Sequence, residues 1–263
     1  MTMLTRGADR LLELHAAELP QKDELCGCFW AVLALRLHGE GPVEQDDVAV
    51  QAGSVLTVHG SREVLPFGEP GRGDFLVQLP VTDDNASSGT SAHGLARAVS
   101  ALSSGRLAAS PLTELDASGV RALLRAAADA SAPVVLIANV QTRAFWGSHP
   151  TAAQVAAYLE RGELAAGPRA DWSVGHFVGL VGLSEGRSGA LVTVADTYPS
   201  IGLGGVHLQP VEAVASALAG RGVLVVARPD TARRVAEAAG GLQELWDNGS
   251  PLPAALEAAT RGS

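Results

Sequence analysis

Lysine, aromatic residues and cysteine are all scarce in this chain of 263 residues. Lys22 is the single lysine, and 28 acidic residues against 19 basic ones give a net charge of −9. Binding to nucleic acid requires clustered lysine and arginine, and the sequence contains no basic stripe. The composition therefore argues against a nucleic-acid partner.

Long apolar runs are also missing. No segment approaches the roughly 18 consecutive apolar residues that a membrane-spanning helix requires. Charged residues interrupt positions 1–20, so this stretch does not read as a secretory signal. Only one residue separates Cys26 from Cys28, which is too close for an unstrained disulfide. We therefore expect no membrane partner and a cytoplasmic location, where both thiols stay reduced.

The residues that are abundant indicate a globular chain. Apolar residues make up 47% of the sequence and charged residues 18%, a balance that is typical of folded domains. The length is near the upper end of what one domain holds. We predict a single domain over residues 1–240 and a C-terminal tail over residues 241–263; the oligomeric state stays open.

Apolar periodicity predicts an α+β fold. The apolar run 133–140 is typical of a central strand buried on both faces. Within 41–73 strand and short helix are both possible, and the role of the middle region 41–150 stays open. We predict helices over 6–19, 26–37, 95–107, 119–130, 150–164, 211–219 and 231–239, and strands over 74–81, 133–140, 177–183, 190–195 and 222–227.

A thiol marks the start of the second predicted helix. Residues 21–30 read QKDELCGCFW, so Cys26 lies where a polar turn gives way to an apolar helix. Unpaired N–H groups at a helix start favour a thiolate over a thiol. The amide of Gln21 is near enough in sequence to donate to an oxyanion beside that sulfur. Gly27 carries no side chain that would block a substrate.

Two other interpretations of this segment stay open. A free cysteine in a helix is often a small buried apolar residue, and this is the first alternative for Cys26. Alternatively Cys28 is the reacting thiol, but it is followed by the bulky Phe29 and is further from Gln21. We favour Cys26 as the nucleophile and expect Cys28 to face the core.

A predicted hairpin supplies a base and an acid. The strands 177–183 and 190–195 are joined by the turn-rich segment 184–189, with His176 before the first strand and Asp196 after the second. In an antiparallel pair these positions lie at the same end. His176 suits a general base that Asp196 orients. The simpler alternatives are a solvent-facing His176 and an Asp196 that only begins a turn.

These segments together resemble the papain-like cysteine peptidase superfamily, especially C39-type leader peptidases and phytochelatin synthases. The order Gln21, Cys26, His176, Asp196 is the order of that superfamily. The resemblance implies a helical half that carries the cysteine, packed on a mostly antiparallel sheet that carries histidine and aspartate. The chain departs from the pattern in having Gln21 one residue closer to the cysteine and a longer interval before the histidine.

The resemblance implies an enzyme that transfers an acyl group from a peptide or amide bond through a thioester on Cys26. Water as acceptor makes it a peptidase or amidase, and an amine makes it a transpeptidase. The resemblance makes small dedicated substrates, such as a natural-product precursor peptide or a glutathione-like thiol peptide, as plausible as general protein. No metal or other cofactor is expected, and His93, His149 and His207 are interpreted as surface or loop residues. The alternative is a non-catalytic binding or interaction protein of the same fold.

Overall fold

The computed structural model describes residues 2–58, 65–84 and 87–246. Its main sheet has the strand order β4-β9-β5-β6-β7-β8, with β1 added along β6, and every pairing in it is antiparallel. The strands are β1 (Thr2–Leu4), β2 (Leu56–Thr57), β3 (Val81–Thr82), β4 (Ala108–Thr113), β5 (Val135–Gln141), β6 (Gly175–Glu185), β7 (Ala190–Ala195), β8 (Val206–Pro210) and β9 (Gly222–Ala227).

Local signals explain where several helices begin. Ser91, Asp116 and Thr151 each accept a hydrogen bond from a first-turn backbone N–H, as helix N-caps do. Asp116 is thus the N-cap of the helix over residues 117–129. The helices are α1 (Ala8–Glu18), α2 (Cys26–Leu37), α3 (Gln45–Ala52), α4 (Ala92–Leu102), α5 (Ala117–Asp129), α6 (Ala152–Arg161), α7 (Val211–Ala217) and α8 (Pro229–Ala239).

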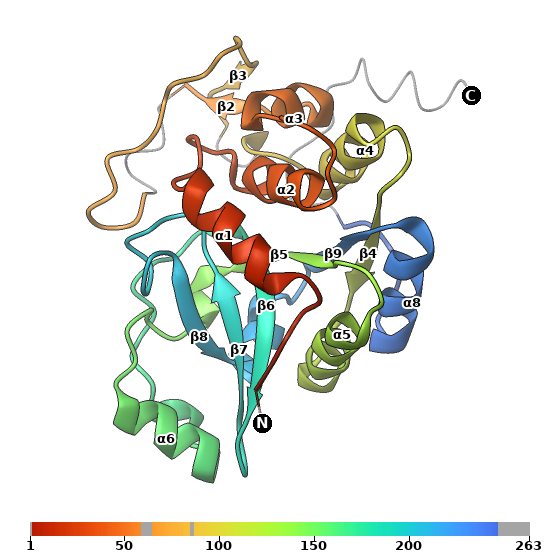
Figure 1. Cartoon of the computed structure of the whole chain (residues 1–263). Helices are drawn as coiled ribbons and strands as arrows, with labels where there is room; N and C mark the ends of the chain where they lie inside the picture. The colour runs from red at the N-terminus through yellow and green to blue at the C-terminus, as the bar shows by residue number, and fades with distance from the viewer. Residues whose placement is uncertain (1, 59–64, 85–86, 247–263) are drawn as a thin grey trace.

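The sheet lies between two helical layers, with α1 to α4 over one face and α5 and α8 over the other (Figure 1). The buried residues of α7 belong to the same core as those of α5 and α8. Alternation along β5 shows how the sheet serves both layers. Val135 and Ile137 belong to the core under α2, while Leu136 and Ala138 belong to the core under α5. The prediction of a central strand buried on both faces is confirmed, and so is the α+β class with a mostly antiparallel sheet.

Helix α2 is the buried centre of its layer. It spans the predicted residues, and positions 27–35 are all buried. On one side it packs against α1, α3 and α4, and on the other against β5 and β6. Trp30 fits against β6 only because residue 179 is glycine: a Cβ atom there would lie 2.4 Å from the indole. The sequence thus fixes the close approach of α2 to the sheet, which sets the position of Cys26.

The strand predicted over 74–81 is wrong. Only its last residue enters a strand, since β3 pairs in parallel with β2 in a separate two-stranded sheet. Side chains take the backbone groups that a longer strand would need: Asp46 accepts from the N–H of Leu76, and Lys22 donates to the carbonyl of Asp74. The segment 41–73, for which the sequence left strand and short helix both possible, contains a helix, α3, and a strand, β2.

The beginning of the predicted tail packs on the domain. Leu242 pairs with Thr113 beside β4, and the Trp246 side chain is buried. Residues 247–263 lie outside the described residues, so the boundary placed at 240 stays a prediction. None of the helices in the described ranges has the length and apolar character needed to cross a membrane.

Candidate active site

Helix α2 presents Cys26 at its first residue. Leu25 is the N-cap and makes no side-chain capping hydrogen bond, so the cap leaves the first-turn backbone N–H groups of α2 unoccupied. Cys26 is partly exposed, whereas the next residues of the helix are buried. The helix start thus places the sulfur at the edge of the core, where another molecule can approach it.

Cys28 has a different environment. Its side chain is fully buried, and its sulfur lies 3.4 Å from the hydroxyl oxygens of both Ser54 and Thr90. Burial raises the pKa of Cys28 to about 12, although the two hydroxyl contacts oppose the shift. Cys28 therefore stays a neutral thiol in the core, as the sequence predicted.

His176 meets both of its expected partners. It lies near the start of β6, is 4% exposed, and its Nε2 is 3.1 Å from Oδ1 of Asp196. Burial lowers the pKa of His176, but the charge of Asp196, the charge of Cys26 and hydrogen bonds to both outweigh burial and raise it to about 10. Because Nε2 faces Asp196, Nδ1 is the ring nitrogen left for the thiol.

Asp196 follows β7 and serves two purposes. Its Oδ1 faces His176 and also accepts from the backbone N–H groups of Thr197, at 2.7 Å, and Tyr198, at 3.3 Å. Burial opposes ionisation, but the charge and hydrogen bond of His176, together with the backbone N–H of Thr197, lower the pKa of Asp196. The turn role and the contact with His176 therefore occur together, as β6 and β7 pair in the predicted hairpin.

Gln21 is buried and belongs to the same cluster. It is 3% exposed, and its backbone N–H donates to the carbonyl of Thr197 at 3.0 Å. The Thr197 hydroxyl donates to Oε1 of Gln21 and lies 3.2 Å from Nε2 of His176. Because the single hydroxyl proton is directed at Gln21, the oxygen of Thr197 accepts from His176. Nε2 remains as the donor end of the Gln21 amide.

Sequence reasoning missed several residues that hold this cluster together. His15 of α1 donates from Nε2 to the backbone carbonyl of Asp196 at 2.5 Å, while its ring stacks on Trp30. Thr197 links Gln21 to His176 as described. Their signal was weak, because a histidine on an amphipathic helix and a threonine in a turn are both common.

Two aromatic rings cover His176. Trp172 contacts the imidazole edge-on, with ring centroids 4.8 Å apart, and Tyr198 lies parallel to it at 6.1 Å. Trp146, which also precedes β6 in the sequence, packs against Tyr158 in a small separate core. Trp172 therefore borders the histidine and Trp146 is a core residue.

The interpretation of His207 as a surface or loop residue is wrong. It lies in β8, is 6% exposed, and its Nε2 is 4.0 Å from Oδ2 of Asp196. The short strand gave too little alternation to reveal which residues face inward. Among the residues that the structure describes, no group of three or more histidine, cysteine, aspartate or glutamate side chains is arranged to hold a metal ion.

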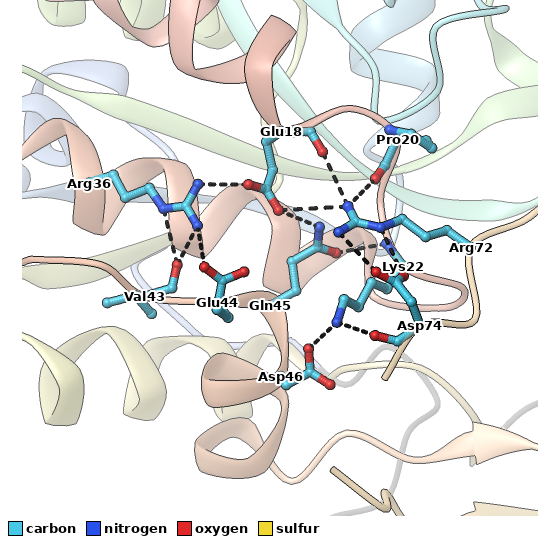
Figure 2. Close-up of polar contacts among 10 residues, drawn as sticks. All are labelled: Glu18, Pro20, Lys22, Arg36, Val43, Glu44, Gln45, Asp46, Arg72 and Asp74. Carbon is cyan, nitrogen blue, oxygen red and sulfur yellow. Dashed lines mark hydrogen bonds and ion pairs between the residues drawn. The ribbon is translucent and has the colours of Figure 1, made fainter. Parts of the chain in front are cut away.

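The turn that carries Gln21 rests on a buried polar network (Figure 2). Lys22 Nζ pairs with Asp46 Oδ2 at 2.5 Å, and both side chains are 2% exposed. Gln45 accepts from the backbone N–H of Lys22 at 2.8 Å and donates to Glu18 at 2.7 Å. The network also includes Arg36 and Arg72, which pair with Glu18. These contacts fix the path of the chain from α1 to Cys26.

Glu24, two residues before Cys26, gives a prediction about stability. Burial raises its pKa from 4.5 to about 7, against the hydrogen bond it accepts from the backbone N–H of Thr57. The folded state holds this proton more tightly than the unfolded state, so stability falls as pH rises from 4.5 to about 7. Glu24→Gln keeps an acceptor and removes the charge. We expect it to stabilise the protein by about 1 kcal/mol at pH 8, after allowing for solvent screening of a half-buried group.

Urea unfolding at pH 5 and pH 8 measures this difference. The exposed Glu13 of α1 provides the control, since Glu13→Gln should change stability little at either pH. A Glu24→Gln variant that is no more stable than the wild type at pH 8 would contradict the prediction.

The fold and this cluster define an α+β protein in which a helix start and an antiparallel hairpin bring a cysteine, a histidine and an aspartate together. Residues 5–247 match the model of a family described as a family of unknown function (DUF6885). The match covers nearly the whole chain, so the chain belongs to this family. A comparison with curated proteins finds no match.

Proposed function

We propose that the protein is a cysteine-dependent acyl-transfer enzyme of the papain-like class, acting on a peptide or amide bond. One observation carries the proposal: His176 interacts with Cys26 on one side and with Asp196 on the other, although the thiol lies far from both in the sequence. A cysteine packed only as a small apolar residue has no need of such partners, and Cys28 illustrates that simpler case.

The geometry suggests a role for each group. Nδ1 of His176 takes the thiol proton, and the Cys26 thiolate attacks the carbonyl carbon of the substrate. Nε2 of Gln21 and the backbone N–H of Cys26 donate to the oxyanion that forms. His176 then protonates the leaving amine as the C–N bond breaks, which leaves a thioester on Cys26. Asp196 keeps the imidazole oriented and compensates its charge.

The second half of the reaction depends on the acceptor. Water attacks the thioester to give a carboxylic acid, and an amine attacks it to give a new amide; in both cases the thiolate leaves and His176 takes the proton of the acceptor. The packing of α2 against the antiparallel sheet agrees with what the papain-like resemblance implies, which supports the class. Small dedicated peptides and general protein both stay open as substrate classes.

Intact-mass spectrometry tests the proposal directly. Short N-acylated peptides and the corresponding activated esters serve as donors, and a covalent adduct with the mass of the acyl group is expected on the wild type. Cys28→Ser is the matched control because it alters the neighbouring thiol in the same helix, and it should still form the adduct. Cys26→Ala should not. An adduct that persists in Cys26→Ala, or none from any donor, would favour the non-catalytic binding protein instead.

A further inference from the structure

A second histidine lies behind the carboxylate of Asp196. Oδ1 of Asp196 is occupied by His176 and two backbone donors, and Oδ2 is the oxygen directed at His207. The His207 side chain is 2% exposed, and its Nε2 is 4.0 Å from Oδ2. Within the described part of the chain this nitrogen has no hydrogen-bond partner. A buried polar atom of this kind requires a partner.

The proton on the His207 ring can be assigned from its neighbours. Oε1 of Gln209 accepts from the backbone N–H of Trp146 at 2.7 Å, which fixes the orientation of that amide. Nε2 of Gln209 therefore donates, to the carbonyl of Trp146 and to Nδ1 of His207, each at 2.9 Å. Because Nδ1 accepts, the proton of the neutral imidazole is on Nε2, the nitrogen that faces Asp196.

Electrostatics keep this ring neutral. Burial lowers the pKa of His207, and the nearby His176 and His149 act in the same direction. The charges of Asp196 and Asp171 oppose them without reversing the shift. His207 is therefore a neutral N–H donor at physiological pH.

A small cavity joins the two groups. Its volume is about 20 Å³, and both Asp196 and His207 line it. This is enough space for one water molecule, and a water commonly bridges polar atoms that are more than about 3.5 Å apart. The other residues that line the cavity include Thr142, Ser148, Asp171 and Trp172.

We propose that His207 is a positioning residue, whose Nε2–H holds Oδ2 of Asp196 through one water in this cavity and so fixes the carboxylate that orients His176. The inference rests on the proposed function, in which Asp196 orients the base. Without His207 the buried carboxylate loses the donor on Oδ2, and its ionised, oriented form becomes less stable. The imidazolium of His176 then loses part of its stabilisation, and the thiolate of Cys26 with it.

The first test uses the wild-type protein and does not depend on catalysis. Side-chain ¹⁵N NMR of the histidine rings is expected to show His207 as a neutral ring with the proton on Nε2 between pH 6 and pH 8. A proton on Nδ1, or a ring that becomes charged in this range, would overturn the inference.

The second test compares variants by the pH dependence of iodoacetamide alkylation at Cys26. His207→Leu should raise, by about one unit, the pH below which alkylation of Cys26 is lost. In His207→Gln the side-chain amide nitrogen takes the place of Nε2 and should restore the wild-type profile. His38→Leu is the matched control, since His38 also has a buried Nε2 without a partner in the described residues but lines a separate pocket near α8. It should leave the profile unchanged.

The two tests separate the possible failures. If His207→Leu folds with a thermal midpoint close to that of the His38→Leu control and keeps the wild-type profile, His207 does not position Asp196. If wild-type Cys26 itself shows no alkylation below pH 7, the proposed function is wrong, and the ¹⁵N assignment still decides whether His207 donates toward Asp196.

Discussion

Replacing His176 by alanine is expected to slow acylation of Cys26 by about 100- to 10,000-fold, the range that a positioned general base contributes. The pH dependence of alkylation should change as well. With His176 present, the imidazolium persists because its pKa is raised to about 10, so the wild-type rate should stay level from below pH 7 until His176 loses its proton near pH 10. Without His176, the alkylation rate should rise about tenfold per pH unit, as it does for a free cysteine, whose thiol pKa is near 8.5.

Iodoacetamide labelling followed by peptide mass spectrometry measures this profile for each cysteine separately. Cys28, fully buried and bonded to two hydroxyl groups, provides an internal control that should remain unlabelled in the folded protein. His93→Ala is the control for loss of a histidine elsewhere, on α4. A wild-type rate that already follows the ordinary thiol profile would favour a binding protein that retains the fold without the chemistry.

The second large effect concerns the buried ion pair beneath the turn that carries Gln21. Lys22→Met leaves Asp46 as an uncompensated charge at 2% exposure, and we expect a loss of about 3–5 kcal/mol in unfolding free energy. Of the donors described above, Asp46 would then keep the backbone N–H of Leu76. Urea denaturation followed by circular dichroism measures the loss.

A double variant distinguishes charge from packing. Asp46→Asn in the Lys22→Met background removes the stranded charge and should recover part of the loss. The exposed pair between Arg233 and Asp230 is the matched control, because both side chains are more than half exposed and Arg233→Met should cost less than about 1 kcal/mol. Equal losses for Lys22→Met and Arg233→Met would contradict the importance assigned to the buried network.

The hairpin shows how much of the site the sequence contained. Apolar runs on either side of a turn-rich segment predicted β6 and β7, and the antiparallel pairing put His176 and Asp196 at one end without reference to any relative. The sequence predicted helix α2 equally well, because an unbroken apolar run begins directly after a polar turn. The strand expected over 74–81 does not form, because buried side chains of the polar network bind backbone groups of this segment. The apolar alternation within the segment contains no information about those distant side chains.

Sequence alone determined that this is an acidic α+β chain with one thiol at a helix start and a base and an acid on one hairpin. Only the tertiary structure decided which thiol meets the base. Cys26 and Cys28 are two residues apart in a helix, so their side chains lie on different faces of it. The packing of Trp30 against Gly179 orients the helix so that Cys26 faces His176, while Cys28 contacts Ser54. The tertiary structure also decided that His15, Thr197 and His207 surround Asp196, because contacts between distant segments depend on packing rather than on local pattern.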